Sequence, residues 1–419
     1  MKGLLILHGD IIAPEGPKRV SFWEGGYLVS ENGLVRGVFP RLPDEFSGAR
    51  VTELSGSLIM PAFCDMHLHA PQYPMLGLGL DMQLMEWLQK HTFPTEARFC
   101  DADCAQSVYS ALAKELASLG TTRVCAFSSV HSDSTLVLME ELERRGISGL
   151  VGKVNMDRNC PRSLKETAAG SLEKTREWLE KCASFKSVRP ILTPRFFPSC
   201  TEELLSGVGE LAKEKKLRVQ THLSESLGEI ETVRSLSADY RGYYFEYEKH
   251  GLMDGAVLAH CVYSDEEERA AIKRHGAVAV HCPLSNIDVP TGVMPARRFL
   301  NEGVSLALGS DIAGGGTLFM PQVMIGAIRA SKRNHLSEPS ERPLTPAEAF
   351  WLATGAGAIA LGEKPCFKAG APLHAIAVRA DRFSIAGEKP SLKEAFERAL
   401  YMMQPGDITR VYAKGKKVK

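Results

Sequence analysis

The sequence predicts an α/β protein with a (β/α)8 barrel of the TIM type at its centre and a small β-sandwich domain formed by the N- and C-terminal segments. After residue 57, short apolar runs alternate with longer helical stretches at a spacing of roughly 30 to 40 residues, which suits β-α units. Both ends of the chain instead carry short strand-like runs between Gly, Pro and Asn residues. At 419 residues, 44% of them hydrophobic, the chain is long enough to bury a core of this size.

Apolar or β-branched runs are the predicted barrel strands, and the segments between them have apolar residues at spacings typical of helices. The predicted strands are residues 58–66, 121–128, 149–155, 188–195, 217–223, 256–261, 277–282 and 304–309. The predicted helices include residues 101–119, 171–182, 201–215 and 265–274. Eight such β-α units favour a closed barrel, and an open doubly wound sheet is the alternative.

The two ends of the chain differ from its middle. Strand-like runs separated by turn-forming residues lie at residues 4–6, 27–29, 34–39, 375–378 and 410–413. We therefore expect residues 1–57 and 366–419 to form one small β domain, and residues 58–365 to form the barrel.

Charge and composition exclude several classes of partner. Lys+Arg and Asp+Glu number 50 each, so no basic field exists to hold a phosphate backbone, and we expect no nucleic-acid partner. The apolar stretch near the N-terminus ends at His8-Gly9-Asp10, too early for a signal peptide, and no apolar run has the length of a membrane span. Ten cysteines without C-x-x-C pairs predict buried free thiols in a reducing compartment, with the cytoplasm as the expected location.

The most informative motif is His67-Leu68-His69, which ends the first predicted barrel strand. Side chains two apart in a strand point the same way, so both imidazoles can converge on one point. Two neutral imidazoles suit a divalent metal such as zinc. Because two surface histidines can produce the same short pattern, the partners of this pair decide its interpretation.

Those partners follow other predicted strands. His222 ends the fifth strand, His260 ends the sixth, and Asp311 comes directly after the eighth. In a (β/α)8 barrel the active site lies at the carboxyl ends of the strands, so we expect these side chains to lie together. One histidine at a strand end is more often a hydrogen-bonded core residue, but the whole series predicts a metal centre.

The order of these residues at the strand ends is His-x-His, His, His and Asp. In this order, and over essentially the whole chain, the sequence resembles the metal-dependent amidohydrolase superfamily, and in particular its deaminase branch. The resemblance implies that His67, His69, His222 and Asp311 hold one Zn²⁺ per subunit, with Fe²⁺ as the alternative ion. The motifs that carry it are residues 67–73, 86–88, 92–96, 193–196, 222–225, 259–261, 281–286 and 309–315.

A single metal is expected rather than two. Members with two metals usually bridge them through a carboxylated lysine on the fourth strand, whereas this chain has Thr193-Pro194-Arg195 there. Lys153, on the third predicted strand, is the nearby alternative and is interpreted as structural or solvated.

The resemblance implies hydrolysis of guanine to xanthine and ammonia, a step of purine catabolism. Three imidazoles and a carboxylate leave a water on the metal, and the pKa of that water falls toward about 7. Glu225, three residues after His222, is expected to move a proton from this water to the leaving nitrogen. His260 is expected to orient the hydroxide, and Asp311 to be a second proton acceptor.

The expected substrate contacts are Gln72, Trp87, Arg195 and Phe196. Arginine only donates hydrogen bonds, so Arg195 suits the 6-oxo group of guanine and opposes the 6-amino group of adenine. Gln72 offers a donor and an acceptor to a ring edge. Trp87 and Phe196 offer faces for a flat ring, although aromatic residues also simply fill cores.

Other interpretations stay open at this point. A pterin or 8-oxoguanine has the same reactive edge as guanine, and a ring-opening hydrolase or an inactive scaffold would share the fold. His131 and His281 are expected to line the pocket without binding metal, and His374 is expected to be structural. The expected partners are a small purine and, because relatives are often dimers, a second copy of the chain.

Overall fold

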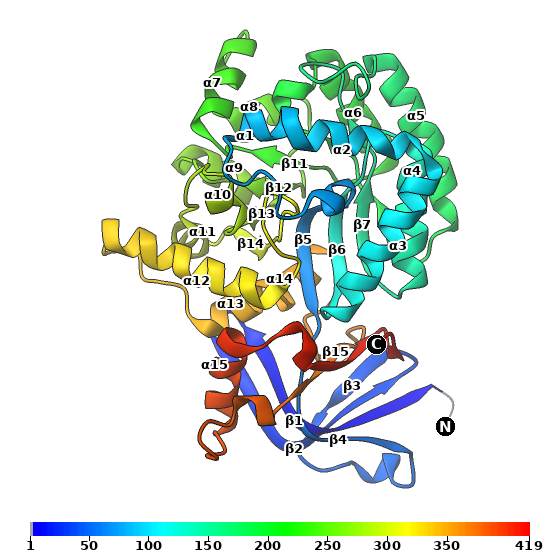
Figure 1. Ribbon diagram of the computed structural model, residues 1–419, viewed down its shortest axis with the longest axis vertical. Coiled ribbons are helices and arrows are strands. Elements are labelled where there is room, and N and C mark those ends of the chain that lie inside the picture. Colours follow the sequence, from blue (N-terminus) through cyan, green and yellow to red (C-terminus); the bar gives the residue numbers. More distant parts are fainter. Residues whose placement is uncertain (1–2) are drawn as a thin grey trace.

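The computed structural model describes residues 3–419 (Figure 1). Its parallel strands alternate with helices along the chain, which confirms the predicted α/β class. The strands form two four-stranded parallel sheets, one two-stranded parallel pair and one seven-stranded mixed sheet. No helix among these residues is both long enough and apolar enough to cross a membrane.

The parallel strands are the scaffold of the candidate site. Almost all of their residues are buried, as expected for strands covered on both faces. The first sheet runs β5 (Phe63–His69), β6 (Thr121–Phe127), β7 (Ser148–Gly152) and β9 (Val188–Pro190), the pair is β8 (Val154–Asn155) with β10 (Thr193–Pro194), and the second sheet runs β11 (Gln220–Leu223), β12 (Val257–His260), β13 (Val278–His281) and β14 (Ser305–Leu308).

Backbone hydrogen bonds connect the two parallel sheets on both sides. On one side, the Gln220 N–H of β11 donates to the Leu192 carbonyl at 2.9 Å. On the other side, the Asp311 N–H donates to the His67 carbonyl at 2.8 Å, and the His69 N–H donates to the Ile312 carbonyl at 3.0 Å. The segment after β14 therefore lies beside the end of β5.

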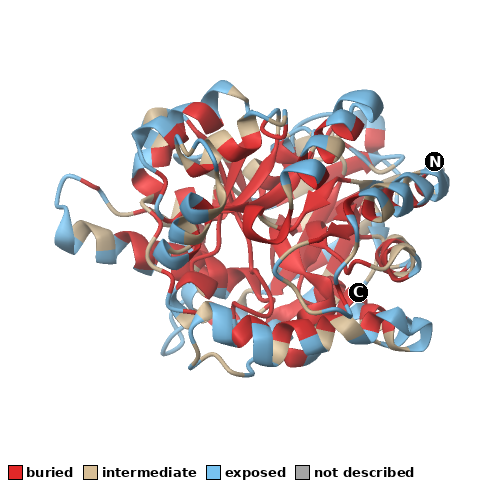
Figure 2. Ribbon diagram, turned by 90° about the horizontal axis from the view of Figure 1, so that it is seen from above, coloured by how far each residue is buried: buried red, intermediate tan, exposed pale blue. Residues whose placement is uncertain are grey.

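Helices cover the parallel strands from outside, so that buried residues concentrate at the centre and exposed residues on the outer helix faces (Figure 2). Polar residues begin several helices: the Asp101 carboxylate accepts the Asp103 N–H at 2.9 Å, and the Thr201 hydroxyl accepts the Leu204 N–H at 3.2 Å. The helices are α1 (Leu84–Trp87), α2 (Phe93–Ala97), α3 (Ala102–Ser118), α4 (Ser132–Arg144), α5 (Ala168–Lys181), α6 (Glu202–Lys215), α7 (Leu227–Leu236), α8 (Tyr243–Glu248), α9 (Glu266–Arg274), α10 (Ser285–Asp288), α11 (Ala296–Glu302), α12 (Met320–Ser337), α13 (Pro346–Leu352), α14 (Gly355–Ala360) and α15 (Leu392–Met402).

The two ends of the chain share the seven-stranded sheet, which lies below the parallel strands in Figure 1. β15 from the C-terminal segment pairs antiparallel with β4, and β4 pairs parallel with β1. The described strands form one sheet here rather than two separate ones. Its order is β17 (Lys416–Lys417), β16 (Ile408–Ala413), β15 (His374–Arg379), β4 (Val51–Pro61), β1 (Leu4–Gly16), β2 (Arg19–Glu31) and β3 (Leu34–Phe39).

Some predicted strand boundaries were wrong. The run at residues 58–66 is divided, because residues up to Pro61 belong to β4 and residues from Phe63 belong to β5. At the break, the Ala62 N–H donates to the His374 carbonyl at 3.2 Å. An unbroken apolar run gives no signal that the chain changes sheets, since both strands are buried there. β1 and β2 are also much longer than the short strands expected, at 13 residues each.

Candidate active site

Four side chains that are far apart in the sequence converge at the carboxyl ends of the parallel strands. His67 and His69 end β5, His222 lies in β11, and Asp311 follows β14. His67 Nε2 is 3.1 Å from Asp311 Oδ1, His69 Nε2 is 3.5 Å from the same oxygen, and the Nε2 atoms of His69 and His222 are 3.0 Å apart. All four residues are buried. We call them the His/Asp cluster.

The nitrogens of this cluster have the arrangement of metal ligands. The Nδ1 of His222 donates to the Arg195 carbonyl at 2.6 Å, so its Nε2 carries a lone pair directed at His69. His67 Nε2 is buried, and its 3.1 Å contact with Asp311 Oδ1 does not have the geometry of a hydrogen bond. Burial lowers the pKa of His67, His69 and His222, which keeps these imidazoles neutral. Neutral imidazoles whose lone pairs converge beside a carboxylate fit a divalent metal ion.

Asp311 is held from two sides. Burial alone would raise its pKa, but the contact with His67 and the nearby histidines hold that pKa well below the usual range. The Ser285 hydroxyl donates to Asp311 Oδ2. Behind it, the buried carboxylate of Asp65 accepts the Ser310 N–H at 2.9 Å and also the Ser310 hydroxyl, which fixes the backbone directly before Asp311.

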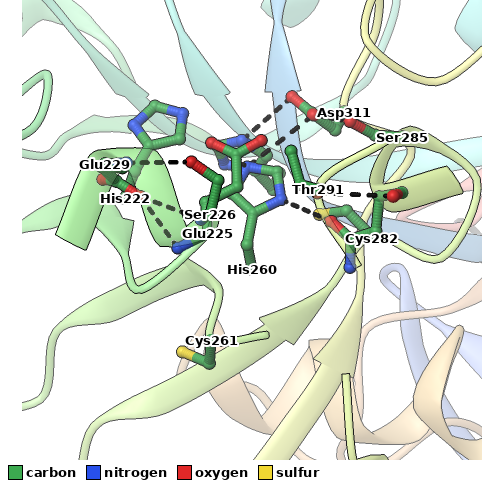
Figure 3. Close-up of polar contacts among 12 residues, drawn as sticks. His222, Glu225, Ser226, Glu229, His260, Cys261, Cys282, Ser285, Thr291 and Asp311 are labelled. Atoms are coloured by element: carbon green, nitrogen blue, oxygen red, sulfur yellow. Dashed lines mark hydrogen bonds and ion pairs between the residues drawn. The ribbon is translucent and has the colours of Figure 1, made fainter. Parts of the chain in front are cut away.

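Glu225 lies three residues beyond His222 and points toward the cluster (Figure 3). It is 7% exposed, and burial raises the pKa of its carboxyl group to about 7. Its backbone N–H donates to Glu229 Oε2 at 2.9 Å, and the Tyr243 hydroxyl donates to Glu229 Oε1 at 2.7 Å. Glu225 therefore has a fixed backbone and a carboxyl group that exchanges its proton near neutral pH, which suits a proton shuttle.

His260 faces both carboxyl groups. Its Nε2 is 3.7 Å from Glu225 Oε2 and 3.8 Å from Asp311 Oδ2, and its Nδ1 is 2.9 Å from Asn286 Oδ1. The Asn286 oxygen accepts the Nδ1 proton, so in the neutral ring the Nε2 lone pair is directed into the site. Burial opposes a charge on His260, but Glu225 and Asp311 outweigh it and raise its pKa.

A small, partly open cavity lies beside the cluster. All four expected substrate contacts line it, together with the proposed proton-transfer residues, so the structure brings the predicted site together. This mixture of aromatic, aliphatic and polar lining residues is typical of a small-molecule pocket. The lining residues are His69, Gln72, Leu84, Trp87, Leu88, Arg195, Phe196, His222, Glu225, His260, Ser285, Val289, Asp311 and Gly314.

Two histidines expected at the pocket are not among the residues that line it. His131 lines a separate hollow beside α4 and α5. His281 is buried, and burial lowers its pKa to about 3, so its ring is neutral within the core. Lys153 is buried rather than solvated and pairs with Glu166 at 2.8 Å. His374 is structural as expected, because its Nδ1 is 2.8 Å from the Thr122 hydroxyl.

Several supporting residues were missed by the sequence interpretation. Glu229 had a readable signal, since Ser226 and Glu229 form a capping box at the start of α7. Asn286 and Glu96 lie within the quoted motifs, but nothing in their spacing predicted that they contact His260 and Arg195. Asp65 precedes the histidine pair inside an apolar run, where a carboxylate needs partners that the sequence does not reveal.

Comparison with known proteins agrees with this architecture. The model of the amidohydrolase family matches residues 58–418, and this chain belongs to that family. Among characterised relatives, it is similar to guanine deaminase from Dictyostelium discoideum, with 35% identity over 382 residues that cover 88% of this chain and 84% of the relative. It is also similar to guanine deaminase from Mus musculus, with 36% identity over 392 residues that cover 89% of this chain and 86% of the relative.

A solved structure gives the same match in three dimensions. The crystal structure of guanine deaminase from C. acetobutylicum, with guanine bound in its active site, superposes on this chain with a TM-score of 0.97. The two sequences are 37% identical, and the match covers 99% of this chain and 100% of the other.

Proposed function

We propose that this chain is a hydrolase of C–N bonds that converts guanine and water to xanthine and ammonia in purine catabolism. The observation that carries the proposal is the cavity, which Arg195 and Gln72 line together with Glu225 and three members of the His/Asp cluster. The similarity to guanine deaminases over most of the chain supports the same reaction.

The His/Asp cluster is the proposed metal site. His67, His69, His222 and Asp311 would hold one Zn²⁺ per subunit, with Fe²⁺ as the alternative ion. The support is the convergence of the buried nitrogens and the carboxylate described above. When bound, the ion supplies a polarised water whose pKa is lowered to near neutrality.

The surrounding side chains would carry the protons. The reaction forms a bond between C2 and the water oxygen and breaks the bond between C2 and the 2-amino nitrogen. Glu225 accepts a proton from the water and delivers it to the leaving nitrogen, a role supported by its pKa of about 7. His260 orients the water from its Nε2, and Asp311 is a second proton acceptor.

The base would be recognised by the residues that line the cavity. The Arg195 guanidinium donates to the 6-oxo group, and Gln72 contacts an edge of the ring that has a donor and an acceptor. Trp87 and Phe196 contact the ring faces. Adenine would place its 6-amino group against a guanidinium that has no acceptor to offer it, so adenine is excluded.

The finer architecture is part of this proposal. We infer that the parallel strands form one closed barrel, supported by the hydrogen bonds from Gln220 to Leu192 and from Asp311 to His67. The proposed domains are residues 1–57 with 366–419, and residues 58–365, although β4 continues the terminal sheet as far as Pro61. A sandwich-like fold of the terminal domain would come from bending of its single sheet, as the register shift after Gly9 in β1 supports.

The proposed setting is a cytoplasmic homodimer acting on a small purine, without nucleic acid or membrane. Ten free cysteines, seven of them buried, support a reducing compartment.

The test is release of ammonia from guanine, adenine, a pterin and 8-oxoguanine, measured separately with zinc-loaded and metal-stripped protein. We expect metal-dependent release from guanine above the other three. Release from the pterin or 8-oxoguanine alone would keep the reaction type and overturn the substrate. Silence on all four would overturn the proposed function.

A further inference from the structure

Glu96 lies behind the cavity wall and joins two of the residues that face the substrate. It belongs to α2 and is 1% exposed. Its Oε2 is 2.6 Å from Arg195 Nη1, and its Oε1 accepts from Gln72 Nε2 at 2.9 Å. Arg195 and Gln72 line the cavity, whereas Glu96 is not among the lining residues. We call these three residues the recognition group.

The carboxylate sets the charge of this wall. Arg195 is only 3% exposed, and an unpaired buried guanidinium would be costly. Within residues 3–419, Glu96 is the one acidic side chain in an ion pair with Arg195. The pair leaves the wall with no net charge while guanidinium N–H groups remain available to the cavity. A wall of this kind favours an uncharged ring that carries a hydrogen-bond acceptor.

The Glu96 carboxylate also fixes the orientations of the Arg195 guanidinium and the Gln72 side-chain amide. Phe93 and Glu96 are three residues apart on α2, and the Arg195 guanidinium lies over the Phe93 ring, 5.6 Å from its centre, while it pairs with Glu96. The Gln72 side-chain oxygen accepts the Ala313 N–H at 3.1 Å, so its amide nitrogen is the atom directed at Glu96. Neither the Arg195 guanidinium nor the Gln72 amide can turn without breaking a buried hydrogen bond.

We propose that Glu96 is a positioning residue that determines specificity, because it aligns Arg195 with Gln72 and neutralises the wall so that neutral guanine is bound in preference to an anionic oxopurine. This inference rests on the proposed function and deepens it. The product xanthine has an acidic ring N–H and loses a proton near neutral pH. Arg195 paired with Glu96 lets this anion leave, whereas Arg195 without an acidic partner would retain it.

The test compares three single variants. Glu96→Gln removes the charge at nearly constant shape, and Glu96→Asp keeps the charge but is too short to reach both partners. Glu86→Gln is the matched control, because Glu86 lies in the neighbouring helix α1, is exposed and pairs only with Lys90 in the described chain. Each zinc-loaded variant is assayed for kcat and KM with guanine and for inhibition by xanthine at about pH 6 and about pH 9. Metal content and thermal unfolding are measured in parallel.

For Glu96→Gln we expect KM for guanine to rise about 10- to 100-fold with a smaller change in kcat, as the loss of a charge-assisted hydrogen bond and its alignment predicts. At about pH 9, xanthine should inhibit this variant about 10-fold more strongly than it inhibits wild type, because the xanthine anion meets the Arg195 charge without the compensating charge of Glu96. The other titratable groups facing the cavity are unchanged between the two proteins, so their effects cancel: His69, His222, Glu225, His260 and Asp311. Glu96→Asp should raise KM while keeping the wild-type pH dependence of inhibition.

Distinct results separate the two proposals. If wild type releases ammonia from guanine and a folded, metal-loaded Glu96→Gln matches Glu86→Gln in KM and in xanthine inhibition, only the role of Glu96 is overturned. If Glu96→Gln fails to fold, Glu96→Asp decides, and a wild-type KM there overturns the role. If wild type does not act on guanine, both proposals fall.

Discussion

The His/Asp cluster and the recognition group both contribute side chains to the same cavity, but their charges are arranged in opposite ways. In the cluster, the Nε2 atoms of His69 and His222 lie 3.0 Å apart, and burial keeps these imidazoles neutral beside the Asp311 carboxylate. In the recognition group, the Arg195 charge is matched by Glu96 at 2.6 Å. The first arrangement favours a cation, and the second favours a neutral ring. One cavity can therefore bind an ion and an uncharged base side by side.

The largest effect should come from breaking the cluster. His222→Ala removes one imidazole and its hydrogen bond to the Arg195 carbonyl, so we expect metal content far below one equivalent. Activity on guanine should fall roughly a thousandfold or more, because metal activation of water contributes several kcal/mol. Elemental analysis and ammonia release measure the two effects.

The matched control for this variant is His8→Ala, since His8 lies on β1 and contacts Glu53 at the surface. This control should keep both metal and activity. A His222→Ala protein with a full equivalent of metal and near wild-type activity would show that the cluster is not the metal site.

A smaller effect should follow from removing proton transfer while the cluster stays intact. Glu225→Gln should keep its metal, because Glu225 is outside both groups of potential ligand atoms. We expect kcat to fall roughly 100- to 10,000-fold, which is the range for loss of general acid-base catalysis. Full activity with bound metal would rule out the role of Glu225. Glu268→Gln is the control, because Glu268 is also a buried carboxyl group and accepts a hydrogen bond from Ser224, the residue next to Glu225.

The same contrast explains how much the sequence could predict. The cluster was predictable because its members occupy strand ends, and strands can be recognised from their apolar pattern. His222 and Asp311 lie where the predicted fifth and eighth strands placed them. The family resemblance then gave these positions an expected role.

The recognition group was only half predictable. Arg195 and Gln72 were expected to contact the base, but their link through Glu96 was not, because Glu96 lies 24 residues from Gln72 and 99 residues from Arg195 in the sequence. The change of sheet at Ala62 was missed for a similar reason, since β4 and β5 form one continuous apolar run. Pairings between distant segments depend on tertiary packing, which local patterns do not encode.

The smallest effect should come from Glu268, a buried carboxyl group that does not line the cavity. Burial raises the pKa of Glu268 from 4.5 to about 7, and its partners are protein hydroxyl and amide groups: the Ser264 hydroxyl at 2.5 Å, the Ser224 hydroxyl at 3.1 Å and the Tyr244 N–H at 3.2 Å. Because the pKa is higher in the folded state, the folded chain binds this proton more tightly than the unfolded chain. Its contribution to stability is present below pH 4.5 and is lost as the pH rises through about 7.

Glu268→Gln mimics the protonated form at every pH. As the pH rises from about 5 to about 8, the variant should therefore lose less stability than wild type. We expect the difference in Tm to grow by on the order of a few degrees over this range. Thermal unfolding of metal-loaded protein at both pH values measures it, with kcat for guanine staying close to wild type. If Tm depends on pH in the same way in the variant and in wild type, Glu268 is ionised in the folded protein. If kcat falls as much as in Glu225→Gln, the catalytic role of Glu225 does not come from its position in the cavity.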